Sequence, residues 1–364
     1  ACGGSSSSTS TASSTASSAA SEAASKITKV ALTCDTGTID DESFNQACWS
    51  AVSSYMGDDC QYYIPEADAS DEDRETMIRQ AVNDGADVIV CVGYLYGASL
   101  AWAADQYPDV KFIAIDVTQG DIGTDSIPAN CYCITFKEEQ AGYLAGYAIA
   151  KDGKTKLGFL GGMAVPAVIR YGYGFVQGAD AAAKELNEKV EMNYSWQYGA
   201  TFSASPELQT MAAGWYQAGT EVIFACGGSM FASVVAAAGA EEGKVIGVDV
   251  DQSANIDTYG EGMCVTSAMK GLAETVKHML GEVVAGNFAN YGGQVETLGL
   301  VNGDDPTANY VQLPMETTQW GDGFTQDDYK ALVKAMYDGD VTVSNDISAM
   351  PATTITVNFA GNIK

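Results

Sequence analysis

The sequence has little positive charge. It contains 18 Lys and Arg residues against 47 Asp and Glu residues, so its formal net charge is −29 at pH 7. An acidic chain of this kind repels nucleic acid, and we expect no nucleic acid among its partners. Histidine is also scarce, because His278 is the only one in the chain. We find no Ser-His-Asp set and no residues at metal-ligand spacing, so we expect no catalytic residues, no metal and no cofactor.

Long apolar runs are missing as well. No stretch of about 18 or more apolar residues occurs, so no helix is predicted to cross a bilayer. The chain instead begins with Ala1 and Cys2, followed by a Ser/Thr/Ala/Gly tract that predicts a flexible tether. A small residue, a cysteine and a tether are typical of a bacterial lipoprotein near its signal-peptide cleavage site. We therefore expect a lipid on Cys2 that anchors the protein to the extracytoplasmic face of the membrane; an ordinary cysteine in a tail is the alternative.

The other cysteines lie mostly inside apolar segments. Eight remain when Cys2 is set aside, which is enough for four disulfides in a secreted protein. Segments such as "VALTC", "DVIVC" and "EVIFAC" read as strands, however, and cysteine commonly serves there as a small hydrophobic residue. The pattern therefore favours buried free thiols.

The 364 residues are enough for two compact lobes, and the pattern contains two series of elements. Short apolar runs typical of strands alternate with stretches whose apolar residues recur every three or four positions, as in helices. The strand-like runs are 29–34, 61–64, 87–93 and 110–117 in the first series, then 156–162, 190–199, 221–228 and 244–251 in the second. They predict an α/β protein with two hinged lobes, each a parallel sheet flanked by helices.

The lobe boundaries follow from where the pattern changes. The break between the series falls within 131–156, and a late strand and helix after residue 264 can return to complete the first lobe. We assign 1–25 to the anchor and tether, 26–138 with about 264–300 to lobe 1, and 139–263 with about 301–364 to lobe 2.

Polar residues follow the predicted strands. Ligands of open α/β sheets bind at the carboxyl ends of the strands, so these residues are the candidates for a binding site. They are rich in Asp and Gly: "DTGTIDD" from Asp35, "DVTQG" from Asp116, "GGSM" from Gly227 and "DVDQ" from Asp249.

Two segments resemble nucleotide-binding motifs but lack features that those motifs require. "DGKT" at 152–155 lacks the preceding glycine of a phosphate-binding loop, and "GYGFVQG" at 172–178 lies in a predicted helix, where its glycines favour close helix packing. Asp40 and Asp41 form a carboxylate pair that acid-base chemistry can use. Helix capping is the simpler interpretation of the pair, because both precede a predicted helix.

Several segments together resemble the basic membrane protein family, the PnrA-like purine nucleoside receptors. They are "DTGTIDDESFNQACW", "FIAIDV", "EEQAGYLAGYAIA", "KLGFLGGMAVPAVIRYGYGFVQGA", "YGATFS", "VIFACGGS", "GVDVDQS" and "TSAMK", in order from about residue 27 to about 300. The resemblance implies a type I periplasmic-binding-protein fold and the role of substrate-binding component of an ABC importer.

The resemblance also implies ligand-binding residues. Phe44 and Phe202 would stack on the two faces of a purine, and aromatic faces suit a flat base. Asp35 and Asp116 would accept hydrogen bonds from the base edge, with Asn45 in support. The remaining candidates are Asp41 in the opening motif, Gly227 for close approach, Asp249 for the ribose hydroxyls, in competition with Asp251, and Lys270 for the sugar or for Asp249.

The expected function is that of a lipid-anchored receptor, most simply a monomer. It would bind a purine nucleoside of the guanosine, inosine or adenosine type between two lobes and deliver it to an ABC permease and its ATPase. A receptor for riboflavin or a sugar on the same fold is an alternative, and an enzyme of nucleoside metabolism is another.

Overall fold

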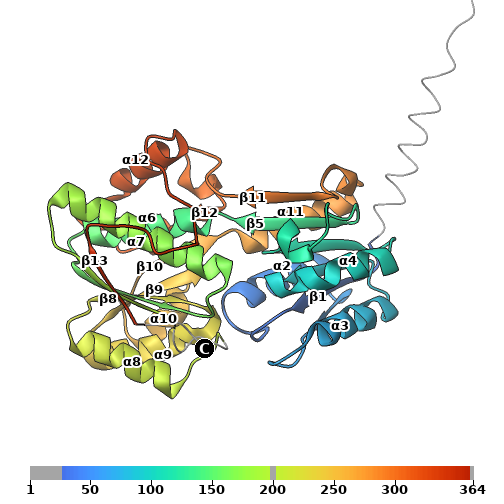
Figure 1. The fold of residues 1–364 in the computed structure, drawn as a ribbon, viewed down its shortest axis with the longest axis horizontal. Helices are drawn as coiled ribbons and strands as arrows, with labels where there is room; N and C mark the ends of the chain where they lie inside the picture. Colours follow the sequence, from blue (N-terminus) through green and yellow to red (C-terminus); the bar gives the residue numbers. More distant parts are fainter. Residues whose placement is uncertain (1–26, 197–201, 361–364) are drawn as a thin grey trace, which may run out of the picture. The chain divides into compact units, whose positions relative to one another are not determined.

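The computed structural model describes residues 27–196 and 202–360, and these form two units (Figure 1). Unit 1 comprises the chain up to Asp35, Trp49–Cys133 and Ala273–Val295. Unit 2 comprises Thr36–Cys48, Ile134–Leu272 and the chain from Glu296 on. Cys2 lies outside the described residues.

Unit 1 is built on a six-stranded sheet with the strand order β11-β5-β4-β3-β1-β2. Its pairs β1–β2, β1–β3 and β3–β4 are parallel, and β1 and β3 are buried along their whole length. The strands are β1 (Val30–Cys34), β2 (Cys60–Tyr63), β3 (Val88–Val92), β4 (Lys111–Ile115), β5 (Cys131–Phe136) and β11 (Gln294–Leu298); the helices are α3 (Asp71–Asn83), α4 (Gly97–Gln106), α5 (Gln119–Ile122) and α11 (Leu272–Val284). The unit boundaries fall within β5, β11 and α2 (Phe44–Met56).

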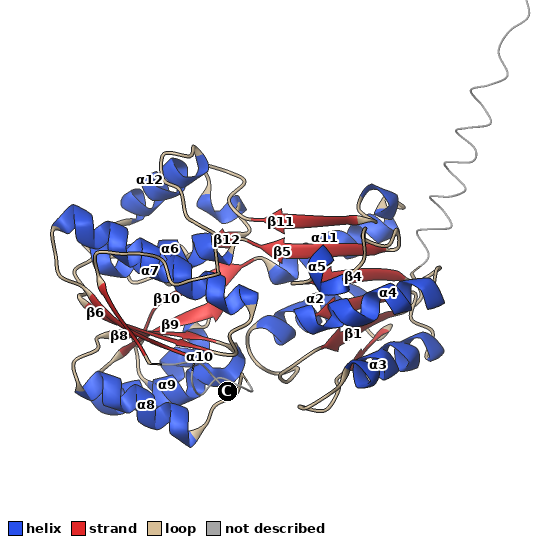
Figure 2. Ribbon diagram, viewed as in Figure 1, coloured by secondary structure: helices blue, strands red, loops and turns tan. Residues whose placement is uncertain are grey.

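Unit 2 is built on a seven-stranded sheet with the strand order β12-β10-β9-β8-β6-β7-β13. Figure 2 shows α6 and α7 on one side of this sheet and α8 and α9 on the other. The strands are β6 (Lys156–Gly161), β7 (Glu191–Ser195), β8 (Val222–Cys226), β9 (Lys244–Asp249), β10 (Cys264–Lys270), β12 (Val311–Gln312) and β13 (Thr356–Phe359); the helices are α6 (Glu138–Lys151), α7 (Pro166–Leu186), α8 (Pro206–Gln217), α9 (Phe231–Glu241), α10 (Ser253–Ile256) and α12 (Gln326–Tyr337).

The predicted α/β class with two largely parallel sheets is confirmed. Helices on both faces of a parallel sheet leave its central strands without a solvated side, which is why they appear in the sequence as continuous apolar runs. The run Val222–Cys226 illustrates this, because all of its residues are buried between the two helical layers of unit 2.

The unit boundaries differ from the predicted lobes in three places. β10 was predicted in lobe 1, but it pairs in parallel with β9 in the sheet of unit 2, so only the chain after Leu272 returns to unit 1. Thr36–Cys48 and the residues from Ile134 to Glu138 also belong to unit 2. Contacts between distant segments decide these boundaries, and a one-dimensional pattern does not contain them.

The cysteines agree with the sequence prediction. Cys91, Cys131, Cys133, Cys226 and Cys264 are buried free thiols, and Cys60 is a half-buried one. Cys34 and Cys48 are buried too.

Glycines allow α6 and α7 to pack closely, as the sequence predicted for "GYGFVQG". A Cβ atom built on Gly174 of α7 would lie 2.1 Å from the carbonyl oxygen of Glu139 on α6. One built on Gly146 of α6 would lie 2.2 Å from the carbonyl oxygen of Phe175 on α7. The backbones of the two helices therefore touch where any side chain would separate them.

This packing predicts that replacing glycine with alanine destabilises the protein at Gly174 but not at Gly214. Gly174→Ala should lower the free energy of unfolding by about 1–3 kcal/mol, because the added methyl overpacks the α6–α7 interface. Gly214→Ala in α8 is the matched control: a Cβ there meets nothing within 4 Å. That variant should gain about 0.5–1 kcal/mol from helix propensity. Urea unfolding of both variants is the measurement, and a Gly174→Ala protein as stable as wild type would contradict the packing account.

Candidate functional site

Two predicted aspartates follow strands β1 and β4 of the sheet in unit 1, which lie on either side of β3. Asp35 comes directly after β1; it is buried, and one of its carboxylate oxygens accepts a hydrogen bond of 3.0 Å from the backbone N–H of Leu95. A Cβ on Gly93 would lie 2.0 Å from the Asp35 carboxyl carbon, so a glycine must follow β3 there. Asp116 comes directly after β4 and is half-buried.

Unit 2 repeats this arrangement at the ends of its own strands. Asp249 ends β9, and Gly227 follows β8. A Cβ on Gly227 would lie 2.9 Å from Cα of Gly162, the residue after β6, so the ends of β6 and β8 approach closely. Asp116 and Asp249 share left-handed backbone angles, with φ of 63° and 68°. Such angles are uncommon for residues other than glycine and cluster at binding sites.

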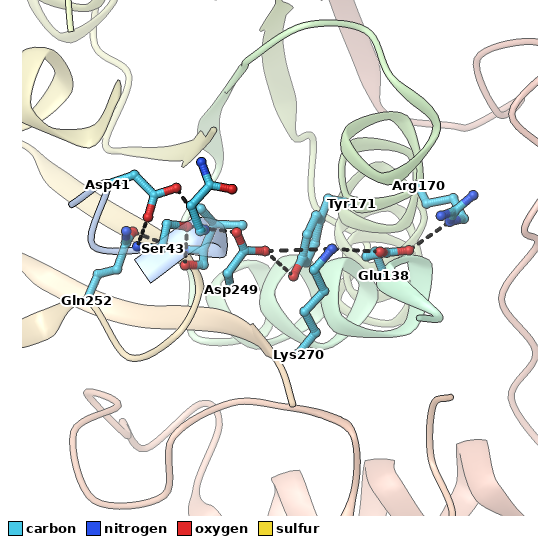
Figure 3. A network of polar contacts seen from close by, with 10 residues as sticks. Asp41, Ser43, Glu138, Arg170, Tyr171, Asp249, Gln252 and Lys270 are labelled. Carbon is cyan, nitrogen blue, oxygen red and sulfur yellow. Dashed lines mark hydrogen bonds and ion pairs between the residues drawn. The ribbon is translucent and has the colours of Figure 1, made fainter. Parts of the chain in front are cut away.

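The carboxylate of Asp249 is the centre of a buried polar network (Figure 3). One oxygen accepts a hydrogen bond of 2.7 Å from the Ser43 hydroxyl, and the other accepts one of 3.0 Å from the Tyr171 hydroxyl. The ammonium of Lys270 lies 4.0 Å away. At this distance Lys270 can compensate the charge of Asp249; its predicted role in ligand binding stays a prediction.

Lys270 makes its shorter ion pair with another residue. Its Nζ lies 2.9 Å from Glu138 Oε2, and Nε of Arg170 lies 2.7 Å from Glu138 Oε1. Glu138 has no exposed surface. Burial acts to raise the pKa of Glu138, but the two cations and their hydrogen bonds outweigh burial and hold that pKa below its ordinary value. Glu138 is therefore an ionised carboxylate between two cations.

Aromatic rings surround the same ammonium. Nζ of Lys270 lies 4.8 Å from the ring centroid of Phe44 and 5.6 Å from those of Phe136 and Tyr171. A cation at this distance is attracted by the negative face of the ring. The cation–π contact with Lys270 thus helps to fix the position of Phe44, the predicted stacking residue.

Asp41 caps α2, as the simpler interpretation of the sequence held. Its carboxylate accepts hydrogen bonds of 3.0 Å from the backbone N–H groups of Ser43, Asn45 and Gln46. The pKa of Asp41 is raised to about 6. Burial is the largest cause, and the nearby charge of Asp249 adds to it; together they outweigh the three hydrogen bonds, which lower the pKa. A ligand contact by Asp41 stays a prediction.

Asn45 holds the loop that precedes α2. Its amide donates hydrogen bonds of 2.8 and 3.1 Å to the carbonyls of Thr36 and Thr38. Its amide oxygen is buried without a hydrogen-bond partner among the described residues. A ligand contact by Asn45 remains a prediction as well.

Phe202 lies in unit 2, against the strand ends. Its ring contacts Gly162, where a Cβ would lie 2.1 Å from a ring carbon. Its carbonyl accepts a hydrogen bond of 3.2 Å from the backbone N–H of Ser229, just after Gly227 and β8. The backbone of Phe202 has φ of 54°, again in the left-handed region.

The competitor Asp251 is exposed and lies outside the network. Its carboxylate accepts hydrogen bonds from the backbone N–H of Ser253 and from the Thr317 hydroxyl. Of the two aspartates in "DVDQ", only Asp249 contacts Ser43 and Tyr171.

Sequence reasoning missed part of the network. Ser43, Glu138, Arg170 and Tyr171 were not among the candidates. The rule that picked the aspartates applies to Glu138 too, because it follows β5 and opens α6. Arg170 and Tyr171 carry no local signal, since they lie inside the long helix α7. Among the residues that the structure describes, no three His, Cys, Asp or Glu side chains are grouped to hold a metal ion.

The family to which the chain belongs follows from a comparison with a family model. The model for PnrA-like ABC transporter substrate-binding proteins matches residues 27–304. The chain belongs to this family. It is therefore a substrate-binding protein of an ABC transporter, with a small-molecule ligand and a transporter as partner.

Individual relatives agree with this assignment. A nucleoside-binding protein of an ABC transporter from Lactococcus lactis, BmpA, is 29% identical over 76% of this chain and 80% of its own length. Basic membrane protein B of Borreliella burgdorferi is 30% identical over 76% of this chain and 80% of its own length.

Solved structures confirm the type I periplasmic-binding-protein fold. An ABC transporter solute-binding protein from Conexibacter woesei aligns with a TM-score of 0.65 and 25% identity over 87% of this chain and 98% of that one. A solute-binding protein from Aeropyrum pernix aligns with a TM-score of 0.64, over 88% of each chain. ABC substrate-binding proteins act outside the cytoplasm, and no helix in the described ranges is long and apolar enough to span a bilayer.

Glu139, beside the network, carries a titratable carboxyl in an unfavourable place. It is buried, and its Oε2 has no hydrogen-bond partner in the described part of the chain. Burial, reinforced by the charge of Glu138, raises the pKa of Glu139 to about 7. In the folded protein this carboxyl therefore keeps its proton up to about pH 7, whereas in the unfolded chain it loses the proton near its ordinary pKa of 4.5.

The buried carboxyl of Glu139 therefore lowers the stability of the folded state in a pH-dependent way, and a glutamine at this position removes that effect. Between about pH 4.5 and 7 the folded state binds more protons than the unfolded state, so wild-type stability falls as pH rises. Glu139→Gln cannot ionise and should gain about 3 kcal/mol relative to wild type across this window. Urea unfolding of both proteins at pH 5 and pH 8 measures the gain. The same stability difference at both pH values would show that Glu139 does not titrate as described.

Proposed function

We propose that the protein is a receptor for a purine nucleoside, which it binds through strand-end residues and delivers to an ABC permease and its ATPase. The observation that carries the proposal is the carboxylate of Asp249. It already accepts hydrogen bonds from two hydroxyl groups, those of Ser43 and Tyr171, in a buried setting. Ribose hydroxyls offer the same donor chemistry, and a buried carboxylate is a strong acceptor for it.

The base would be held by aromatic stacking and by the other aspartates. Lys270 lies over one face of the Phe44 ring, so the opposite face is the one proposed to stack on the purine. Phe202 is proposed to stack on the other side of the base. Asp35 and Asp116 of unit 1, with Asn45 in support, are proposed to accept hydrogen bonds from the amino and imino groups of the base edge.

The charges favour a neutral ligand over a nucleotide. Both cations of the network, Lys270 and Arg170, already form ion pairs with Glu138, and Lys270 also faces Asp249. Phosphate groups would meet these carboxylates in a chain whose net charge is −29. The expected repulsion makes a nucleoside the better ligand.

The remaining parts of the proposal concern the protein's setting. A lipid on Cys2 would anchor the receptor to the extracytoplasmic face of the membrane, where it would act as a monomer. We propose no enzymatic activity, in keeping with a family of substrate-binding proteins.

A thermal-shift screen of the full chain tests the ligand class. Ligands that bind only the folded state raise the unfolding midpoint according to affinity and concentration. Guanosine, inosine and adenosine should raise the midpoint, whereas free ribose and uridine should not. A shift with riboflavin or a hexose but with no nucleoside would keep a receptor and reject the nucleoside. Conversion of inosine into another product would show that the protein is an enzyme, contrary to the proposal.

A substitution at Asp249 tests the residue that carries the proposal. Asp249→Asn keeps the shape of the side chain, and asparagine tolerates the left-handed backbone at this position. Losing the carboxylate should raise the Kd for guanosine about 10- to 100-fold, the effect of one lost hydrogen bond to a charged group.

The matched control is Asp251→Asn, an equal change at the exposed aspartate two residues later, which should leave the Kd unchanged. Isothermal titration calorimetry measures both variants. Wild-type affinity in Asp249→Asn would remove Asp249 from the site.

A further inference from the structure

Glu138 is the carboxylate on which the position of Lys270 depends. It has no exposed surface, and its two oxygens lie 2.9 Å from Lys270 and 2.7 Å from Arg170. A buried charge is tolerated only when it is paired and hydrogen-bonded, and Glu138 meets both conditions. Figure 3 shows the resulting row of side chains: Arg170, Glu138, Lys270 and Asp249.

The ammonium of Lys270 lies between two carboxylates and closer to one of them. Its distance to Glu138 is 2.9 Å and its distance to Asp249 is 4.0 Å. At the first distance it forms a hydrogen-bonded ion pair. At the second it compensates the charge of Asp249 without taking up a hydrogen-bonding position on that carboxylate.

Loss of the Glu138 charge would reverse this preference. A buried ammonium without its close partner is attracted to the next carboxylate, and Asp249 is near enough to receive it. Lys270 would then donate a hydrogen bond to Oδ1 of Asp249, the oxygen that now accepts a hydrogen bond from the Tyr171 hydroxyl. Ribose hydroxyls would have to compete with an ammonium for the same acceptor.

The chain fixes Glu138 in place independently of the site. It opens α6 directly after β5, and the carbonyl of Leu298 accepts a hydrogen bond of 2.9 Å from the backbone N–H of the preceding Lys137. Lys270 is the last residue of β10 in the sheet of unit 2. The backbone that carries Glu138 is thus fixed at the start of α6, next to the hydrogen bond of Lys137.

We propose that Glu138 is a positioning residue: it holds Lys270 over Phe44 and away from Asp249, and so keeps Asp249 free to select ligands by their ribose hydroxyls. This inference rests on the proposed function, because it assigns Asp249 to the sugar. Glu138 itself touches no ligand in this account. It acts through Lys270.

The test compares Kd values for guanosine and 2′,3′-dideoxyguanosine, which differ only in the two sugar hydroxyls. Wild type should prefer guanosine strongly. Glu138→Gln should raise the Kd for guanosine about tenfold and that for the dideoxy compound less than about threefold, so the preference shrinks. Glu139→Gln is the matched control, because it is the same change at a buried neighbour without an ion pair to Lys270, and it should keep the wild-type preference.

A double variant covers the case in which Glu138→Gln does not fold. Glu138→Gln with Lys270→Met removes both partners of the ion pair and leaves no ammonium to compete for Asp249. Its preference for guanosine should stay within about threefold of wild type even where overall affinity falls. A double variant without that preference would overturn the proposal.

The outcomes separate the two hypotheses. If wild type prefers guanosine and Glu138→Gln keeps the full preference, the positioning role is wrong while the nucleoside receptor stands. If wild type binds guanosine without preference over the dideoxy compound, the assignment of Asp249 to the sugar fails, and the positioning role fails with it. If wild type binds neither compound and also fails to bind inosine and adenosine, the proposed function is overturned as well.

Discussion

The buried charge of Asp249 is the constraint on which the candidate site depends. A carboxylate with 6% exposure at the end of a strand must be compensated, because a buried charge without partners is costly. Two hydroxyl donors and the nearby ammonium of Lys270 provide this compensation. Lys270 in turn needs Glu138, and Glu138 is balanced by Arg170. The order of the whole network follows from one buried negative charge.

The two units solve the problem of a strand-end aspartate in different ways. In unit 1, Asp35 is held by a backbone N–H at the start of a short helical turn, with Gly93 making room for it. In unit 2, Asp249 is held by side chains from several elements. Backbone donors impose little chemistry of their own, whereas Asp249 accepts hydrogen bonds from two hydroxyl groups and faces an ammonium at 4.0 Å. Selectivity for the sugar therefore depends on unit 2 in our account.

Much of this arrangement could be predicted from the sequence, because it follows from local rules. Apolar runs between helical periods predicted the two sheets, and the rule that ligands bind at carboxyl strand ends selected Asp35, Asp116 and Asp249. For Lys270 the resemblance implied two alternatives, contact with the sugar or pairing with Asp249, and it lies 4.0 Å from Asp249. The placement of β10 and of Thr36–Cys48 was not foreseen, because strand pairing and packing across long sequence separations decide it. Arg170 and Tyr171 were missed for the same reason, since packing of α7 against α6 gives Arg170 its partner Glu138, and packing of α7 against β9 gives Tyr171 its partner Asp249.

The most direct test of the central claim is a crystal structure of the protein with guanosine. Our account predicts that the ribose hydroxyls donate hydrogen bonds to Asp249, that Phe44 stacks on the purine, and that Lys270 remains paired with Glu138. A structure in which guanosine binds elsewhere, or in which Asp249 contacts only Ser43, Tyr171 and Lys270 while the sugar is held by other residues, would contradict it.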